Sequence, residues 1–203
     1  MEKRNWKHSV TLKQRMVLCL AAFFAAFALQ LALNGYQARA VQQVQDDQMG
    51  NFNAISRFQG GVESSISILE AYRWENGETE EMLEKLQAAC STSNAWLWRI
   101  RSNMDGLQNV SDEQWVLYGA VETTYGSYNT LLEELESYLS SGQEAKASQL
   151  YYNKVSVCGG YLSQYTMQLL KASILDAQTT YTEISELGER IALMQIVVVA
   201  LCV

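Results

Sequence analysis

Proline is absent from all 203 residues of the chain. Average usage of roughly 5% would give about ten prolines in a chain of this length. Because proline removes a backbone donor and clashes with the preceding turn, its absence permits long uninterrupted helices. Alanine, leucine, glutamate and glutamine, which favour helices, are frequent. We therefore predict an all-α fold, and no alternating pattern of useful length indicates a strand.

Histidine is nearly absent, since His8 in the basic N-terminal tail is the only one. One histidine supplies no Ser/His/Asp or Cys/His constellation, and the sequence has no glycine-rich phosphate-binding motif and no zinc-type cysteine spacing. We therefore expect no catalytic residue, no metal and no cofactor in this chain. Glu133, Glu134 and Glu136 are interpreted as solvated helix surface. Gly159–Gly160 is interpreted as a point of close helix packing or of a slight bend.

Charge is absent from two segments, Met16–Leu33 and Ile191–Val203. As a helix the first segment would extend about 27 Å, close to the roughly 30 Å hydrocarbon core of a bilayer. The second would extend only about 20 Å. We predict a transmembrane helix at residues 16–33 and the start of a second, truncated one at 191–203. The chain is then expected to be the front part of a longer protein.

The charges elsewhere divide unevenly along the chain. Residues 1–15 carry five basic residues and one acidic residue (+4), and residues 34–190 carry ten basic and twenty-one acidic residues (−11), which sum to −7. Basic residues beside a membrane segment remain in the cytoplasm, so we predict a cytoplasmic tail at 1–15 and an extracytoplasmic domain at 34–190. An acidic domain does not favour nucleic acid as a partner. A signal peptide cleaved near Ala38–Ala40 is the alternative, and it also places the middle of the chain outside.

Three break signals divide the region between the two apolar segments, namely Asn76–Gly77, residues 103–109 around Gly106, and Ser140–Gly142. After the second break, Ser111–Gln114 has the pattern of a capping box, in which the serine caps the helix and the glutamine reaches back. After the first break, Thr79–Glu81 places negative charge at a helix start, which is favourable. The breaks therefore delimit four helices.

Each predicted helix carries an apolar stripe, which favours packing against neighbouring helices. The stripes comprise Val41, Val44, Gln48, Phe52, Ile55, Gln59, Val62, Ile66 and Leu69; Leu83, Leu86, Cys90, Ser93, Leu97, Ile100 and Met104; Tyr118, Val121, Tyr125, Tyr128, Leu132, Leu135 and Leu139; and Leu150, Val155, Cys158, Leu162, Tyr165, Leu169 and Ala172. The last stripe is the least regular. Short connections predict an up-down-up-down antiparallel four-helix bundle. Its first and fourth helices would be continuous with the transmembrane helices.

The best candidates for ligand binding are Trp96, Trp98, Arg99, Arg101 and Trp115. Aromatic rings supply contact area, and arginines in an acidic domain are suited to a carboxylate or phosphate. In the alternative interpretation, the tryptophans fill the lower bundle and the arginines pair with acidic residues at positions 105, 112 or 113. The tyrosines of the third stripe are interpreted as core.

Two cysteines, Cys90 and Cys158, fall in the predicted extracytoplasmic domain, where a disulfide is chemically allowed. Their predicted heights in the bundle match. However, the second and fourth helices lie diagonally in a square bundle, which is wider than the roughly 7 Å that a disulfide permits between Cα atoms. Two free thiols are therefore favoured over a disulfide. Asn109–Ser111 matches a glycosylation sequon, but we interpret the serine as the helix cap.

Taken together, a basic tail, a membrane helix, a proline-free helical domain and a second membrane helix resemble the sensory module of bacterial transmembrane receptors. The chain is most similar in layout to the N-terminal part of two-transmembrane sensor histidine kinases, and chemoreceptors with four-helix ligand domains share this layout. The resemblance implies a homodimer in the membrane that senses an extracellular ligand or accessory protein. It also implies a kinase and a response-regulator partner through cytoplasmic parts beyond this sequence.

Two other functions remain open at this stage. A methyl-accepting chemotaxis receptor would continue into a long cytoplasmic hairpin, whereas a kinase would continue into an ATP-binding fold. A membrane-anchored structural or adhesion bundle, without signalling output, would continue only into a short basic tail.

Overall fold

The computed structural model describes residues 12–72, 79–107 and 110–202, except for the side chains at positions 12, 15, 18, 19, 22, 195 and 197–202. All regular elements in these ranges are helical: α1 (Leu12–Ala71), α2 (Thr79–Gly106), α3 (Asp112–Ser140), α4 (Glu144–Leu150), η1 (Tyr151–Val155) and α5 (Ser156–Cys202). The last three follow one another without a gap and make the fourth helix. The predicted all-α fold with four helices is confirmed.

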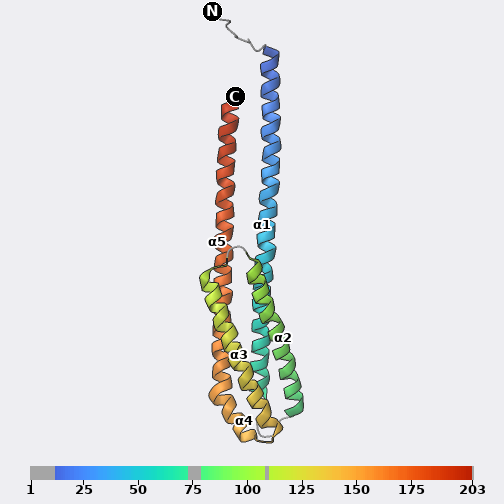
Figure 1. The fold of residues 1–203 in the computed structure, drawn as a ribbon, viewed down its shortest axis with the longest axis vertical. Coiled ribbons are helices and arrows are strands. Elements are labelled where there is room, and N and C mark those ends of the chain that lie inside the picture. Colours follow the sequence, from blue (N-terminus) through green and yellow to red (C-terminus); the bar gives the residue numbers. More distant parts are fainter. Residues whose placement is uncertain (1–11, 73–78, 108–109, 203) are drawn as a thin grey trace, which may run out of the picture. The chain divides into compact units, whose positions relative to one another are not determined.

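The chain forms two compact units, which are described separately. The bundle unit comprises Gln45–Thr180, and the terminal unit comprises Met1–Val44 together with Tyr181–Val203. The helices of the bundle unit are α2, α3, part of α1, and the fourth helix up to Thr180, and Figure 1 shows α2 and α3 beside parts of α1 and α5. This unit is therefore a four-helix bundle.

Specific contacts join each pair of neighbouring helices in the bundle. They are Arg57–Trp96 and Gly61–Ser93 between α1 and α2, Gln87–Glu136 and Arg101–Glu122 between α2 and α3, Ser111–Asp176 and Thr124–Cys158 between the α3 segment and α5, and Asn51–Ser173 and Ile66–Gly159 between α1 and α5. In each of these four neighbouring pairs, rising residue numbers on one helix meet falling residue numbers on the other.

The ends of α3 show why it begins and ends where it does. Ser111 is the N-cap, and its hydroxyl accepts a hydrogen bond from the backbone N–H of Gln114, as predicted. The capping box also predicts that the Gln114 side chain accepts a hydrogen bond from the Ser111 backbone N–H. This part is wrong, because the carboxylate of Asp176 on α5 accepts from that N–H instead, at 3.0 Å. At the other end Gly142 has φ of +70°, and the two backbone bonds of a Schellman motif run to Leu139 and Tyr138.

The other break signals have separate outcomes. Helix α2 begins at Thr79 with Glu80 and Glu81 in its first turn, as predicted, and ends at Gly106. The Asn76–Gly77 signal lies outside the described residues, as does Asn109 of the sequon.

The predicted stripes on α2 and α3 form the core of the bundle. All seven predicted residues of α3 are buried, from Tyr118 to Leu139. On α2 five of the seven are buried, while Leu83 and Cys90 are half-buried. Apolar periodicity therefore identified these two buried faces correctly.

The stripe predicted for α1 is partly wrong. Phe52 is exposed, whereas Asn51 and Phe58, which the prediction omitted, are fully buried. The core-facing stripe of α1 passes through Asn51, whose amide Nδ2 donates to the Ser173 hydroxyl at 3.2 Å. A buried polar residue held by a partner on another helix is invisible to a search for apolar repeats.

The irregular stripe of the fourth helix has a structural cause. The step from Leu150 to Val155 is five residues, and it coincides with the π-helical segment η1. A π-helical turn accommodates one extra residue, so Leu150, Tyr151 and Val155 are all buried while residues 152–154 are exposed. The irregular spacing is visible in the sequence, but the π segment was not predicted from it.

The terminal unit contains residues 12–44 of α1 and residues 181–202 of α5. The two helices approach closely at Gly188, where an added Cβ would lie 3.3 Å from Nε2 of Gln37. Large apolar side chains are exposed along this part of α1, including Met16, Phe23, Phe24 and Leu31, each more than half exposed.

A search of the described residues identifies no helix with the length and apolar character needed to cross a bilayer. Some side chains of both predicted membrane segments lie outside the described residues, at positions 18, 19, 22, 195 and 197–203. The assignments of 16–33 and 191–203 to the membrane stay predictions.

Candidate ligand groove

The five residues predicted to bind a ligand do not gather at one point. Successive helix residues are rotated by about 100°, so positions 96 and 99 of α2 face one side and positions 98 and 101 face another. Trp96 is half-buried, and the Arg57 guanidinium of α1 lies 5.3 Å from its ring centroid. Trp98 is 68% exposed.

The predicted arginines and the third tryptophan lie at separate positions. Arg101 approaches Glu122 of α3 at 3.6 Å, rather than the acidic residues at 105, 112 or 113. Arg99 is exposed. Trp115 packs edge-to-face against Tyr118 on its own helix, with ring centroids 6.1 Å apart. A ligand-binding role for these five residues stays a prediction that this arrangement does not favour.

The two cysteines of the bundle are free in the structure and contact α3. The backbone carbonyl of Cys90 accepts a hydrogen bond from the Tyr125 hydroxyl at 2.8 Å. The Cys158 thiol donates to the Thr124 carbonyl at 3.7 Å. Burial raises the pKa of both thiols, to about 11 for Cys90, where the negative charge of Glu136 adds to the effect.

Close packing rather than anion binding explains Gly159, the first of the paired glycines. An added Cβ would lie 3.1 Å from Cδ1 of Ile66 and 3.3 Å from Cε2 of Tyr128, so the absence of a side chain lets α5 approach both helices. The neighbouring Gly160 faces open space. The close packing predicted for this pair is confirmed at Gly159.

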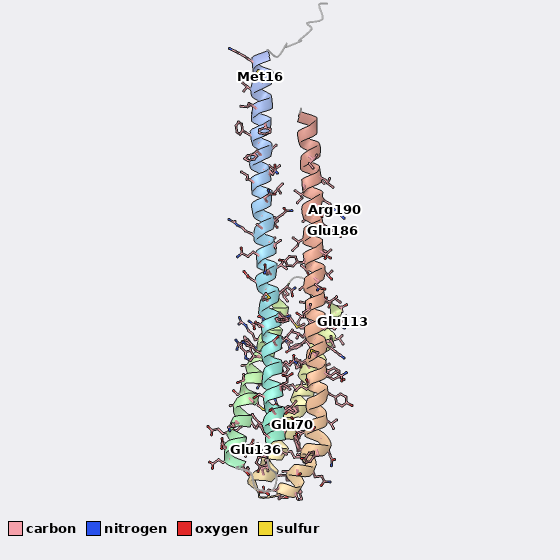
Figure 2. All side chains as sticks on the ribbon, turned by 180° about the vertical axis from the view of Figure 1, so that it is seen from behind. Met16, Glu70, Glu113, Glu136, Glu186 and Arg190 are labelled. Atoms are coloured by element: carbon pink, nitrogen blue, oxygen red, sulfur yellow. The ribbon has the colours of Figure 1, made fainter. Side chains whose placement is uncertain are left out.

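A groove of about 280 Å³ lies between α2 and α3, inside the bundle unit. Its described lining residues are Leu83, Leu86, Gln87, Cys90, Ser91, Asn94, Tyr125, Asn129, Leu132, Glu133 and Glu136. We name this feature the α2–α3 groove. Figure 2 labels Glu136 toward the end of the bundle at which α4 lies.

The local sequence explains why the groove forms here. Residues 90–94 are Cys-Ser-Thr-Ser-Asn, five short side chains in succession on α2. Short residues at positions 91 and 94 leave space against α3 that leucines would fill. This run is visible in the sequence, but only its positions 90 and 93 were assigned to the core stripe, and the groove was not predicted.

The groove combines an apolar floor with oxygen-rich walls. Leu86 is only 4% exposed and Leu132 only 6%, and both belong to the core. The amide Nε2 of Gln87 donates to Oε1 of Glu136 at 2.8 Å, which links the two helices across one wall. Oδ1 of Asn129 is buried and has no hydrogen-bond partner among the described residues.

The electrostatic character of the groove is acidic. Glu133 and Glu136 contribute two carboxylates, and none of the described lining residues is basic. After burial, the charge of Glu136 is the second cause of the raised pKa of the Cys90 thiol. Burial also raises the pKa of Tyr125 to about 12, so this hydroxyl remains a neutral hydrogen-bonding group at physiological pH.

Metal binding and catalysis find no further support in this region. Among the residues that the structure describes, no group of three or more histidine, cysteine, aspartate or glutamate side chains is placed to hold a metal ion. His8 lies outside them. The groove offers hydrogen-bond acceptors and apolar contacts, which suit reversible binding of a small molecule.

The chain matches no protein-family model, no curated protein and no solved structure.

Proposed function

We propose that this chain is the sensory and transmembrane region of a bacterial signal-transduction receptor, specifically of a two-component sensor histidine kinase. The supporting observation is the contrast between its two units. The bundle unit has a buried apolar core and more acidic than basic residues, whereas the terminal unit exposes a succession of large apolar side chains between Met16 and Leu31. Such exposure is unfavourable in water and favourable in lipid.

The order of helix contacts supports an up-down-up-down bundle. Neighbouring helices meet with reversed residue order throughout the bundle unit. Helices α1 and α5 each contribute residues to both units. In the proposal these two helices continue into the membrane and relay displacement to the cytoplasmic side.

The proposed topology follows from the charges. The basic tail at 1–15 is cytoplasmic, and residues 34–190 are extracytoplasmic. The receptor is a homodimer in the cell membrane. The chain itself is not an enzyme; phosphorylation and contact with a response regulator belong to cytoplasmic parts of the parent protein.

Joining residues 1–203 to the cytoplasmic half of a characterised sensor kinase tests the signalling role. Asn51→Leu removes the buried hydrogen bond to Ser173 and repacks α1 against α5. We expect this change to shift autophosphorylation of the fusion at least ~3-fold, because bundle packing biases the two states of the relay. Glu63→Gln, at an exposed position of α1, is the matched control and leaves activity unchanged.

The fusions are made with several positions of the junction between the two proteins. A signalling role is contradicted if the parent, Asn51→Leu and Glu63→Gln fusions have equal kinase activity at every junction. A structural or adhesion bundle predicts that result.

Dimer formation through α1 is tested by disulfide crosslinking in a cysteine-free background. Val41 and Val44 are half-buried, whereas Gln43 between them is exposed. We expect Val41→Cys and Val44→Cys to crosslink between subunits faster than Gln43→Cys. Equal rates at the three positions, or no crosslinking, contradict the proposed interface.

A further inference from the structure

The α2–α3 groove has one unsatisfied acceptor, and none of its described lining residues carries a positive charge to balance the two glutamates. Oδ1 of Asn129 is buried without a hydrogen-bond partner among the described residues, a state that costs free energy unless a donor fills it. Glu133 and Glu136 stand at the same groove. A ligand that offers several donors and a positive charge would give Asn129 its missing donor and would offset part of the charge of the two carboxylates.

The floor of the groove sets a second requirement. Leu83, Leu86 and Leu132 line it with aliphatic surface. A bare metal ion gains nothing from such contacts, and a volume of about 280 Å³ is far larger than an ion needs. The volume is close to the lower end of the roughly 300–1,000 Å³ typical of small-molecule sites.

We propose that the α2–α3 groove is a binding site for a small organic cation, a primary ammonium group carrying a compact apolar body. The ammonium presents three N–H donors to Asn129 Oδ1 and to the carboxylates of Glu133 and Glu136. The apolar body lies against the leucines of the floor. Tyr125, whose hydroxyl donates to the Cys90 carbonyl, also lines the groove.

The same features exclude the opposite charge. A carboxylate or phosphate ligand would meet two glutamates with no basic side chain among the described lining residues. As a stimulus site the groove rests on the proposed sensory function, whereas binding itself is measured on this chain alone.

The alkylation rates of two native cysteines show whether a ligand occupies the α2–α3 groove. Cys90 lines the groove, whereas Cys158 lies on α5 and donates to Thr124 of α3. The probe is 2-phenylethylammonium, with 2-phenylethanol and phenylacetate as the neutral and anionic controls of similar size. The full chain is reconstituted in zwitterionic lipid nanodiscs, and alkylation of each cysteine by N-ethylmaleimide is followed by peptide mass spectrometry.

We expect saturating 2-phenylethylammonium to slow Cys90 alkylation at least ~3-fold and to leave Cys158 unchanged. Phenylacetate should give no protection, and 2-phenylethanol should require at least a ~5-fold higher concentration. Glu133→Gln and Glu136→Gln should each raise the half-protecting concentration ~5-fold or more. Each variant is compared with its own unliganded rate, because Glu136 also influences the Cys90 thiol.

Glu134→Gln is the matched control on the same helix. Its carboxylate accepts from the Tyr138 hydroxyl outside the groove, so protection should equal that of the parent. The site is overturned if phenylacetate protects as well as the amine, if Cys158 is protected equally, or if both groove variants behave like the parent. Protection of Cys90 without any change in the kinase activity of the fusion would keep the site and contradict the sensory role.

Discussion

At the scale of single residues, glycines mark where the helices of the bundle approach most closely. A Cβ added at Gly61 would lie 2.3 Å from the Ser93 hydroxyl oxygen and 3.4 Å from its Cβ. That hydroxyl donates to the Ala89 carbonyl within α2. Gly60, one position earlier, has no atom within 4 Å of an added Cβ. Two adjacent glycines therefore have opposite roles.

This contrast gives a paired prediction. Gly60→Ala should stabilise the chain by about 0.5–1 kcal/mol, since alanine is the better helix former. Gly61→Ala should destabilise it by about 1–3 kcal/mol, because the new methyl group displaces Ser93. Thermal unfolding of the full chain, followed by far-UV circular dichroism in one detergent, measures both.

A second substitution identifies the cause. Ser93→Ala removes the oxygen that meets the new methyl group, so the cost of Gly61→Ala should fall by about 1 kcal/mol or more in that background. If the cost is the same with Ser93 and with alanine at position 93, the close approach of α1 and α2 is not its origin.

At the scale of elements, the fourth helix has an irregular spacing. Its buried residues Leu150 and Val155 are five positions apart, one more than the step of four in a regular α-helix. The π segment η1 holds the extra residue within Tyr151–Val155, where positions 152–154 are exposed. The helices α2 and α3 have no comparable step of five in their buried stripes.

Deleting Asn153 should therefore be tolerated. The deletion converts the step from Leu150 to Val155 into a regular step of four and leaves both residues facing the core. We expect the stability to remain within about 1 kcal/mol of the parent. Deleting the exposed Ser127 from α3 is the control, and it rotates Tyr128 and all later residues of α3 by about 100° away from the core.

The control deletion should abolish cooperative unfolding, since it displaces a whole buried stripe. Similar losses from the two deletions would contradict the account of η1 as an accommodated extra residue.

At the scale of the whole molecule, buried thiols and phenols tie stability to alkaline pH. Burial raises the pKa of Cys90 from 9.0 to about 11, and the pKa values of Tyr118 and Tyr125 from 10.0 to about 12. The unfolded chain thus loses these protons at lower pH than the folded chain. Their contribution to stability is complete below about pH 9 and is lost as the pH rises toward about 12.

We therefore expect the melting temperature to fall progressively above pH 9. In Cys90→Ala the decrease between pH 9 and 10 should be smaller, because Cys158 is then the only thiol of the bundle that contributes there, while the tyrosines of the unfolded chain start to titrate near pH 10. A melting temperature that is constant from pH 8 to 11 would contradict the burial of these groups.

The sequence predicted more of the fold than of the site. The missing prolines, the break at Ser140–Gly142 and the stripe from Tyr118 to Leu139 follow from local chemistry, and they were sufficient to predict α3 and its ends. Asn51 was missed because its burial depends on a partner 122 residues away. The α2–α3 groove was missed because it arises where the short side chains of α2 face α3, and the two helices meet only in the folded bundle.

The central claim is that the bundle unit is extracytoplasmic while the N-terminal tail is cytoplasmic. It is tested by labelling single cysteines in an otherwise cysteine-free chain with a membrane-impermeant maleimide on intact cells. Ser140→Cys, at the exposed end of α3, should be labelled to the same extent before and after permeabilisation, whereas Lys7→Cys should be labelled only afterwards. Labelling of Ser140→Cys only after permeabilisation would contradict the account.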